Sequence, residues 1–147
     1  MKVRPSVVIL EGYSVLLMRY VYNGTEVYCL PGGNPDPMET LQEAVERELK
    51  EELGLKVEVQ DLLFVAETHK PEKQEIVLHH IFEGKIAEGN PTINPEQTSA
   101  LSAEWIEVDK LGDKNLYPNI GAEISILLGL GSKDRITYLG NINQHWF

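Results

Sequence analysis

The densest group of chemically useful side chains is a run of acidic residues between Thr40 and Gly54. Glu48, Glu51 and Glu52 are spaced three and four residues apart. On an α-helix this spacing puts side chains on neighbouring positions of one face, so the three carboxylates are expected to converge. Like charges that close repel each other, and a divalent cation removes the repulsion. Carboxylate oxygens suit Mg²⁺ or Mn²⁺, which also take substrate phosphates as ligands, so the pattern predicts a magnesium or manganese site.

Arg47 belongs to the same group because it precedes Glu51 by four residues. Its guanidinium can pair with a carboxylate and fix the rotamer of that side chain. The alternative interpretation of this segment is an ordinary solvated helix face, which is the common case for a charge-rich composition.

Local signals define the helix that must position these residues. Thr40 followed by Glu43 forms a capping box, so the helix is expected to begin there. Gly54 is expected to end it, because glycine takes the left-handed cap conformation at little cost. Apolar residues at three- and four-residue spacing give the helix one buried stripe, formed by Leu41, Ala44, Val45, Leu49 and Leu53.

From Gly33 to Leu55 the chain follows the pattern Gly-x5-Glu-x7-Arg-Glu-U-x-Glu-Glu-x-Gly-U at every position, where U is aliphatic. This pattern is the Nudix box, and the chain resembles a Nudix hydrolase from about Val3 to Leu130. The resemblance implies an α/β (α+β) Nudix fold, a curved mixed β-sheet sandwiched between helices. It implies cleavage of the diphosphate linkage of a nucleoside diphosphate joined to another group. It also implies a set of metal ligands with Arg47 as their orienter: Glu48, Glu51, Glu52 and the backbone carbonyl of Gly32.

The general base would be a glutamate that the metal does not fully use. The segment Glu88–Ala100 is polar and contains two prolines and a glycine, the composition of a functional loop. Nudix enzymes often bring a further glutamate to the metals from such a loop. Glu96 is therefore the candidate base, with Glu88 and Glu104 behind it, and Glu48 or Glu52 would serve otherwise.

Two residues outside the box are candidate substrate contacts. Arg19 ends a predicted strand, where it either holds an outer phosphate or is a solvated strand-end charge. In some nucleotide-cleaning relatives an asparagine near the position of Asn119 contacts the base, and the alternative is that Asn119 caps the next helix. Pro71 resembles a proline of enzymes that split ADP-ribose, although a turn would favour proline anyway.

The remaining pattern predicts strands over 3–10, 14–20, 26–30, 55–68, 74–85 and 102–108, and a second helix from about 120 to 128. His79 and His80 must point to opposite faces of their strand, so they cannot both serve one site. They are interpreted as packing or surface residues, as are His69 and His145.

Composition limits the class of protein. The 147 residues are 42% hydrophobic, which fits one soluble domain spanning 1–147. A net charge of -10 argues against a nucleic-acid polymer as partner and favours a nucleotide-type small molecule bound through cations. Cys29 is the single cysteine, so an intrachain disulfide is excluded and a cytoplasmic location fits. Nothing in the sequence predicts a membrane span.

Residues 131–147 fall outside the resemblance and carry Tyr138, Trp146 and Phe147. These aromatics either fold back on the domain or meet a partner subunit, which leaves a homodimer open. Two other functions are less compatible with these residues. A nucleotide sensor on the same fold typically loses box residues, and none is missing here; isomerase chemistry needs a cleft cysteine, and Cys29 lies on the preceding strand in the wrong context.

Overall fold

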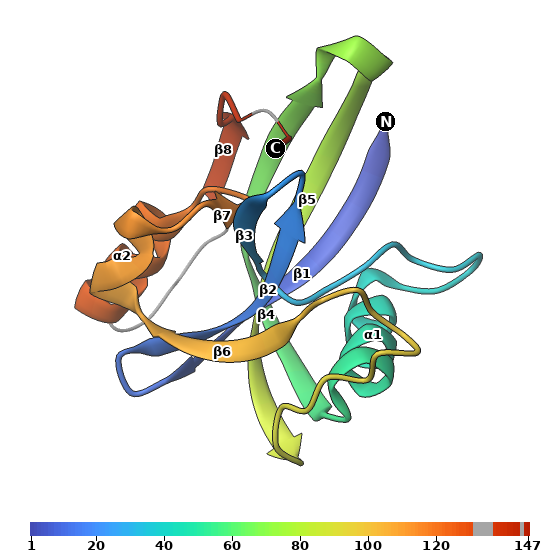
Figure 1. The fold of residues 1–147 in the computed structure, drawn as a ribbon, viewed down its shortest axis with the longest axis vertical. Coiled ribbons are helices and arrows are strands. Elements are labelled where there is room, and N and C mark those ends of the chain that lie inside the picture. The colour runs from blue at the N-terminus through green and yellow to red at the C-terminus, as the bar shows by residue number, and fades with distance from the viewer. Residues whose placement is uncertain (131–136, 145) are drawn as a thin grey trace.

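The computed structural model describes residues 1–130, 137–144 and 146–147. Its elements follow one another as shown in Figure 1. In chain order they are β1 (Lys2–Glu11), β2 (Ser14–Tyr22), β3 (Thr25–Cys29), α1 (Leu41–Leu53), β4 (Lys56–Lys70), η1 (Pro71–Lys73), β5 (Glu75–Glu88), β6 (Ser102–Glu107), η2 (Val108–Asp113), β7 (Leu116–Tyr117), α2 (Gly121–Leu130) and β8 (Thr137–Asn141).

The strands form one mixed sheet in the order β7-β3-β2-β1-β5-β4-β8, with β6 paired to β2. β1 and β2 are paired only next to their connecting turn, at Leu10–Val15 and Glu11–Ser14. Further back, β1 runs parallel to β5 from Lys2 to Ile9, while β2 pairs with β3 and β6. The two strands therefore diverge toward the start of β1, and this divergence opens the sheet into a wedge.

The segment after β3 partly fills the wedge. The backbone N–H of Val7 donates to the carbonyl of Pro31 at 2.9 Å, and that of Gly33 donates to the carbonyl of Pro5 at 3.2 Å. The loop that leads into α1 is thus attached to β1 by backbone hydrogen bonds.

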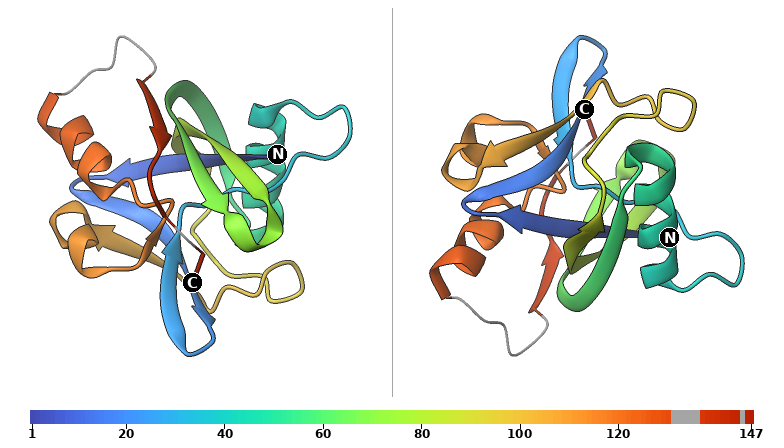
Figure 2. Two further views of the ribbon diagram at one scale, coloured as in Figure 1. Left: turned by 90° about the horizontal axis from the view of Figure 1, so that it is seen from above. Right: turned by 90° about the horizontal axis from the view of Figure 1, so that it is seen from below.

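Helices lie on the two faces of the sheet, as the two views of Figure 2 show. α1 packs its apolar stripe on Val7, Ile9 and Val57. α2 packs on the other face, where Ile120, Ile124 and Leu127 join Val8 and Leu63. Neighbouring residues of β1 therefore enter opposite cores, as the two-residue period of a strand requires. The expected sandwich of a curved mixed sheet between helices is confirmed.

The signals that defined the first helix are confirmed. Thr40 accepts a hydrogen bond from the backbone N–H of Glu43, and Gly54 caps the other end with φ 67°. Strand ends are less well predicted: β2 continues to Tyr22, and β4 continues through His69 to Lys70 before the short 3-10 turn. β7 and β8 were not predicted, because each is short and depends on a partner strand far away in sequence. Within the part of the chain that the structure describes, no helix is long and apolar enough to cross a membrane.

Candidate functional site

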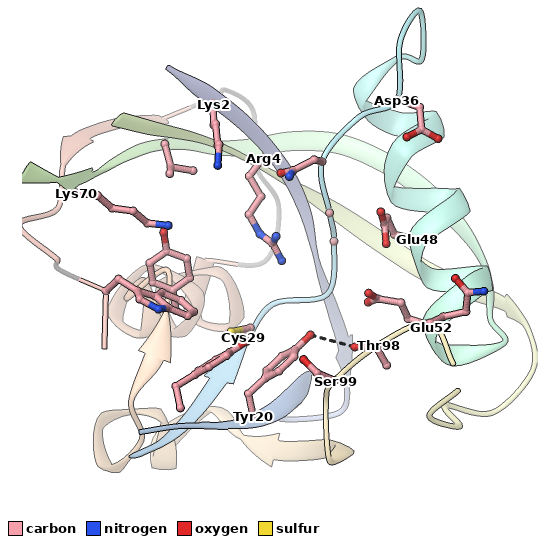
Figure 3. A pocket seen from close by; sticks show the side chains of 18 residues that line it. Lys2, Arg4, Tyr20, Cys29, Asp36, Glu48, Glu52, Lys70, Thr98 and Ser99 are labelled. Carbon is pink, nitrogen blue, oxygen red and sulfur yellow. Dashed lines mark hydrogen bonds between the residues drawn. The ribbon is translucent and has the colours of Figure 1, made fainter. Parts of the chain in front are cut away.

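A cleft of about 600 Å³ lies in the wedge between β1, β2 and α1. Much of its wall comes from the start of β1, the end of β2, the loop 32–36, one face of α1 and the loop 97–99. Five further residues complete it: Lys70, Val77, Tyr117, Trp146 and Cys29, whose place in the cleft corrects the sequence interpretation. Figure 3 shows that carboxylates stand on one side of the cleft and cationic side chains on the other. The two sides are described in turn.

Glu48 and Glu52 form the acidic side, and both line the cleft. They are one helical turn apart, so they project in nearly the same direction from α1. Gly33 passes close to Glu48: a Cβ atom at Gly33 would lie 2.4 Å from Glu48 Cδ and 2.5 Å from its Oε1. A glycine is needed at this position for the loop and the carboxylate to share the space.

Glu51 does not join this pair in the cleft. It is separated from Glu52 by about 100° around the helix axis, because each residue turns an α-helix by that angle. Its side chain is 42% exposed and pairs with Arg47 at 3.2 Å. Accordingly, no three His, Cys, Asp or Glu side chains are gathered into a metal-holding cluster among residues 1–130, 137–144 and 146–147.

Arg47 connects the helix to the loop before it. Its Nε donates to Glu39 Oε2 at 2.8 Å, and its Nη2 donates to Glu39 Oε1 at 3.0 Å, a bidentate pair. Nη1 donates to Glu48 at 3.1 Å and to Glu51 at 3.2 Å. Nη2 also reaches the carbonyl of Asn34 at 3.1 Å. The guanidinium therefore holds the loop, the cleft carboxylate Glu48 and the outer carboxylate Glu51 in fixed relation.

The pKa values of the two cleft carboxylates are both raised. Burial raises the pKa of Glu52 to about 7, with the negative charge of Glu48 adding to the effect and the positive charge of Arg4 opposing it. Burial likewise raises the pKa of Glu48, and its hydrogen bond from Arg47 acts in the opposite direction. Two carboxylates in this position need a compensating cation to remain ionised together.

The opposite side of the cleft carries Lys2, Arg4 and Lys70. Lys2 and Arg4 are two residues apart on β1, so they share a face of the strand. Lys2 and Lys70 both pair with Glu75, at 3.2 and 4.0 Å. Burial lowers the pKa of Lys70. Arg4 makes no ion pair with any residue that the structure describes, so its charge is available to the cleft.

The sequence interpretation missed all three cationic residues of the cleft, Lys2, Arg4 and Lys70. Two basic residues at alternate positions ahead of the apolar run of β1 were the available signal. That signal could not show which face of the sheet would be hollow.

Arg19 was expected to contact substrate, but the structure does not bring it into the cleft. Tyr20 and Tyr22 of β2 line the cleft. Because side chains alternate between the two faces of a strand, Arg19 points to the opposite face. There Arg19 donates to Ser102 at 3.2 Å and pairs with Glu26 at 3.1 Å. Glu104 lies beside it at 3.3 Å, so this reserve candidate for the base is also away from the cleft.

Glu96, Glu88 and Asn119 also lie outside the cleft wall. Glu96 is exposed in the loop 89–101, although its neighbours Gln97 and Thr98 line the cleft. Glu88 ends β5 and lines a separate hollow beside Gly54. Asn119 is exposed, and its backbone N–H donates to Gln144.

The loop 89–101 is attached to the end of α1. The backbone N–H of Asn94 donates to the carbonyl of Glu52 at 2.9 Å, and that of Thr92 donates to the carbonyl of Leu53 at 3.0 Å. These bonds use carbonyls at the C-terminus of the helix, which have no partner within it. They place Thr98 and Ser99 beside Glu52 as a third side of the cleft.

His79 and His80 point away from each other, as expected, and neither lines the cleft. His79 is fully buried, and its Nε2 lies 2.9 Å from Thr68 Oγ1. The same hydroxyl lies 2.9 Å from the Tyr117 hydroxyl. His79 is thus a packing residue, while His145 lies outside the described residues.

The side chains present fit a hard divalent cation. Glu48 and Glu52 supply carboxylate oxygens in a half-buried position, and Gly32 adds backbone in the cleft wall. Carboxylate and carbonyl oxygens are the donors that Mg²⁺ and Mn²⁺ prefer. Burial and the charge of Glu48 raise the pKa of Glu52, so a bound cation would stabilise its ionised form.

Comparison with known proteins places this geometry in context. The family model of the NUDIX domain matches residues 2–125. An ADP-ribose pyrophosphatase from Streptococcus suis is similar in structure, with a TM-score of 0.71 and 21% identity over 93% of this chain and 98% of that one. A MutT protein from Methanosarcina mazei Go1 has a TM-score of 0.72 and 21% identity over 90% and 96%. A UDP-X diphosphatase has a TM-score of 0.70 and 20% identity over 92% and 66%.

These structural likenesses concern the fold, because the identities are low. Comparison with curated protein sequences finds no significant match.

Proposed function

Because the chain belongs to the Nudix family, we propose that it is a metal-dependent pyrophosphohydrolase that cleaves the diphosphate linkage of a nucleoside diphosphate joined to another group. One observation carries the proposal: the complete Nudix box folds so that Glu48 and Glu52 stand in a cleft opposite Arg4. The cleft therefore offers cation ligands on one side and a phosphate-binding cation on the other.

The proposed ligands of the divalent ion are Glu48, Glu52 and the carbonyl of Gly32, which line the cleft, together with Glu51, which would have to leave its ion pair with Arg47. When bound, the ion would lower the pKa of a water molecule and neutralise phosphate charge. Arg47 acts as a positioning residue, because its hydrogen bonds hold Glu48 and Glu51 against the loop. Arg4 replaces Arg19 as the proposed phosphate contact, since Arg4 lines the cleft and Arg19 does not.

The reaction requires a proton acceptor for the attacking water. The water oxygen bonds to one phosphorus, the bond from that phosphorus to the bridging oxygen breaks, and two phosphate-bearing products leave. Of the candidate bases that the box and its loop supply, Glu48 and Glu52 line the cleft and Glu96 does not, and Glu48 is already bound by Arg47 at 3.1 Å. We therefore propose Glu52 as the acceptor of the water proton.

The substrate is expected to be a nucleotide-type small molecule. ADP-ribose is a candidate because an ADP-ribose pyrophosphatase shares the fold, and a nucleotide sugar is a candidate because a UDP-X diphosphatase shares it. A nucleoside triphosphate is the third. Assays with each compound and with Mg²⁺ or Mn²⁺, with both products identified, discriminate among them.

Glu52→Gln tests the proposal, with Glu46→Gln as its matched control. Glu46 is exposed on the same helix and loses the same charge, but it does not line the cleft. Glu52→Gln should abolish magnesium-dependent turnover and weaken Mn²⁺ binding measured by calorimetry, while Glu46→Gln changes neither. Full activity in Glu52→Gln would refute the assignment. Tight binding of a nucleotide to the wild-type protein without turnover would instead identify a sensor.

A further inference from the structure

Trp146 lies outside residues 2–125, the part of the chain that the family model matches, and yet it lines the cleft. Trp146 is 36% exposed. A side chain that belongs to the cleft wall but not to the family core is suited to distinguish this protein's substrate from others.

Contacts upstream of Trp146 hold the tail against the domain. β8 runs parallel to β4, and the backbone N–H of Ile142 donates to the carbonyl of Glu67 at 3.1 Å. Gln144 then makes two hydrogen bonds: its Nε2 donates to the carbonyl of Leu116 at 2.8 Å, and its Oε1 accepts from the backbone N–H of Asn119 at 2.7 Å. The tail therefore folds back on its own domain, which answers the alternative left open by the sequence.

Trp146 is part of an aromatic group at the end of the cleft where Lys70 lies. Its ring centroid lies 4.9 Å from that of Tyr22 and 4.9 Å from that of Tyr117, both in edge-to-face geometry. Lys70 Nζ lies 5.3 Å from the Trp146 centroid, within the range of a cation–π contact. Tyr22 stacks on Tyr20 at 5.5 Å. These contacts leave the cleft volume of about 600 Å³ free, so the indole forms a wall of the cleft.

The hydroxyl of Tyr117 is hydrogen-bonded to the buried hydroxyl of Thr68, which is also hydrogen-bonded to His79. The ring of Tyr117 also meets the ring of His79 edge to face at 5.3 Å. An aromatic wall backed by a buried polar network keeps its geometry when a ligand enters.

We propose that Trp146, with Tyr22 and Tyr117, forms a nucleobase site of this enzyme. The inference rests on the proposed function and adds the position of the base. A nucleobase is planar and stacks on aromatic side chains. Arg4 stands between Lys70 and the carboxylates Glu48 and Glu52 (Figure 3). The cleft thus presents aromatic groups, then a cation, then the metal ligands, the order in which a nucleoside diphosphate presents base, phosphates and scissile linkage.

Fluorescence of a single tryptophan tests this site directly. The chain has two tryptophans, so Trp105→Phe leaves Trp146 as the only one. AMP and UMP should quench this fluorescence saturably in metal-free buffer, whereas ribose 5-phosphate, which lacks a base, should not. Failure of both nucleotides to quench would overturn the nucleobase site.

Affinity measurements on Trp146 variants give a second test. Trp146→Ala should weaken the binding of AMP or UMP about tenfold in Kd, the effect of losing one stacked aromatic group, and leave the Kd of ribose 5-phosphate unchanged. Trp146→Phe keeps an aromatic face and should retain most of the affinity. Circular dichroism confirms that both variants fold. Unchanged nucleotide affinity in Trp146→Ala would refute the site.

Turnover separates this inference from the proposed function. If the wild-type protein hydrolyses ADP-ribose and Trp146→Ala keeps the same KM, the nucleobase site is wrong while the enzyme assignment stands. If no diphosphate compound is hydrolysed but AMP still quenches Trp146, the enzyme assignment is wrong and the nucleobase site stands.

Discussion

Gly33→Ala is expected to abolish most activity while leaving the protein folded. The new Cβ would lie 2.4 Å from Glu48 Cδ and 2.6 Å from its Cγ, far closer than atoms can approach. The atoms it meets are the end of a flexible side chain, so Glu48 can rotate away and relieve the clash. The backbone of Gly33 does not have a positive φ, so alanine is compatible with its conformation.

The expected magnitude follows from this geometry. Moving the Glu48 carboxylate by about 1 Å or more removes it from its position beside Glu52, and a misplacement of that size costs on the order of 100-fold in turnover. The free energy of unfolding should change by less than about 1 kcal/mol, since no buried apolar contact is lost.

Gly32→Ala is the matched control, because a Cβ atom at Gly32 would meet backbone atoms and not a flexible side chain. A Cβ there would lie 2.2 Å from the carbonyl oxygen of Pro5 and 2.7 Å from Ser6 Cα. Backbone atoms of β1 cannot move aside cheaply, so this variant should lose about 3 kcal/mol of unfolding free energy.

Urea unfolding measured beside magnesium-dependent phosphate release distinguishes the two variants. Near-normal turnover in Gly33→Ala would show that the position of Glu48 does not matter for activity, and would refute this reasoning.

Two further predictions concern groups around the cleft. Glu39→Gln removes the charge that holds Arg47 bidentately, so kcat should fall about tenfold without loss of fold, measured at saturating Mg²⁺; an unchanged kcat would contradict the positioning role of Arg47. Burial lowers the pKa of His79 to about 3, so below pH 6.5 the unfolded chain binds a proton that the folded protein does not. Stability should therefore fall by about 2 kcal/mol from pH 6.5 to 5.0 through this group. Comparing urea unfolding of wild type and His79→Gln isolates that loss, because groups titrating in the opposite direction, such as Glu52, are common to both; equal pH dependence in the two proteins would contradict it.

The acidic helix α1 could be predicted in detail because its determinants are local. The Thr40 cap, the apolar stripe and Gly54 all act within a few residues of one another. The structure reproduces both caps and buries Ala44, Val45, Leu49 and Leu53, while Leu41, in the first turn, is only half-buried. The spacing of Glu48 and Glu52 then fixes their common direction, since a helix has one period. Glu51 shows the limit of this argument: three-residue spacing placed it near the pair, but the bond to Arg47 lies on the outer side.

The opposite wall of the cleft could not be predicted in this way. The sequence of a strand indicates which residues share a face, but it does not indicate which face will line a cleft. Arg19 and Tyr20 point to opposite faces of β2, and in the assembled sheet it is Tyr20 that faces the cleft. Arg4 lines the cleft because β1 and β2 diverge, which is a property of the assembled sheet.

The sequence by itself determined the acidic helix, its ends and the family to which they belong, because those features depend on residues close together in the chain. Only the tertiary structure decided which cation faces the carboxylates and that Trp146 reaches the cleft. Both depend on contacts between segments far apart in sequence, such as the hydrogen bond from Gln144 to Leu116. Such contacts form only after folding has closed the long loops between those segments, so no local pattern in the sequence predicts them.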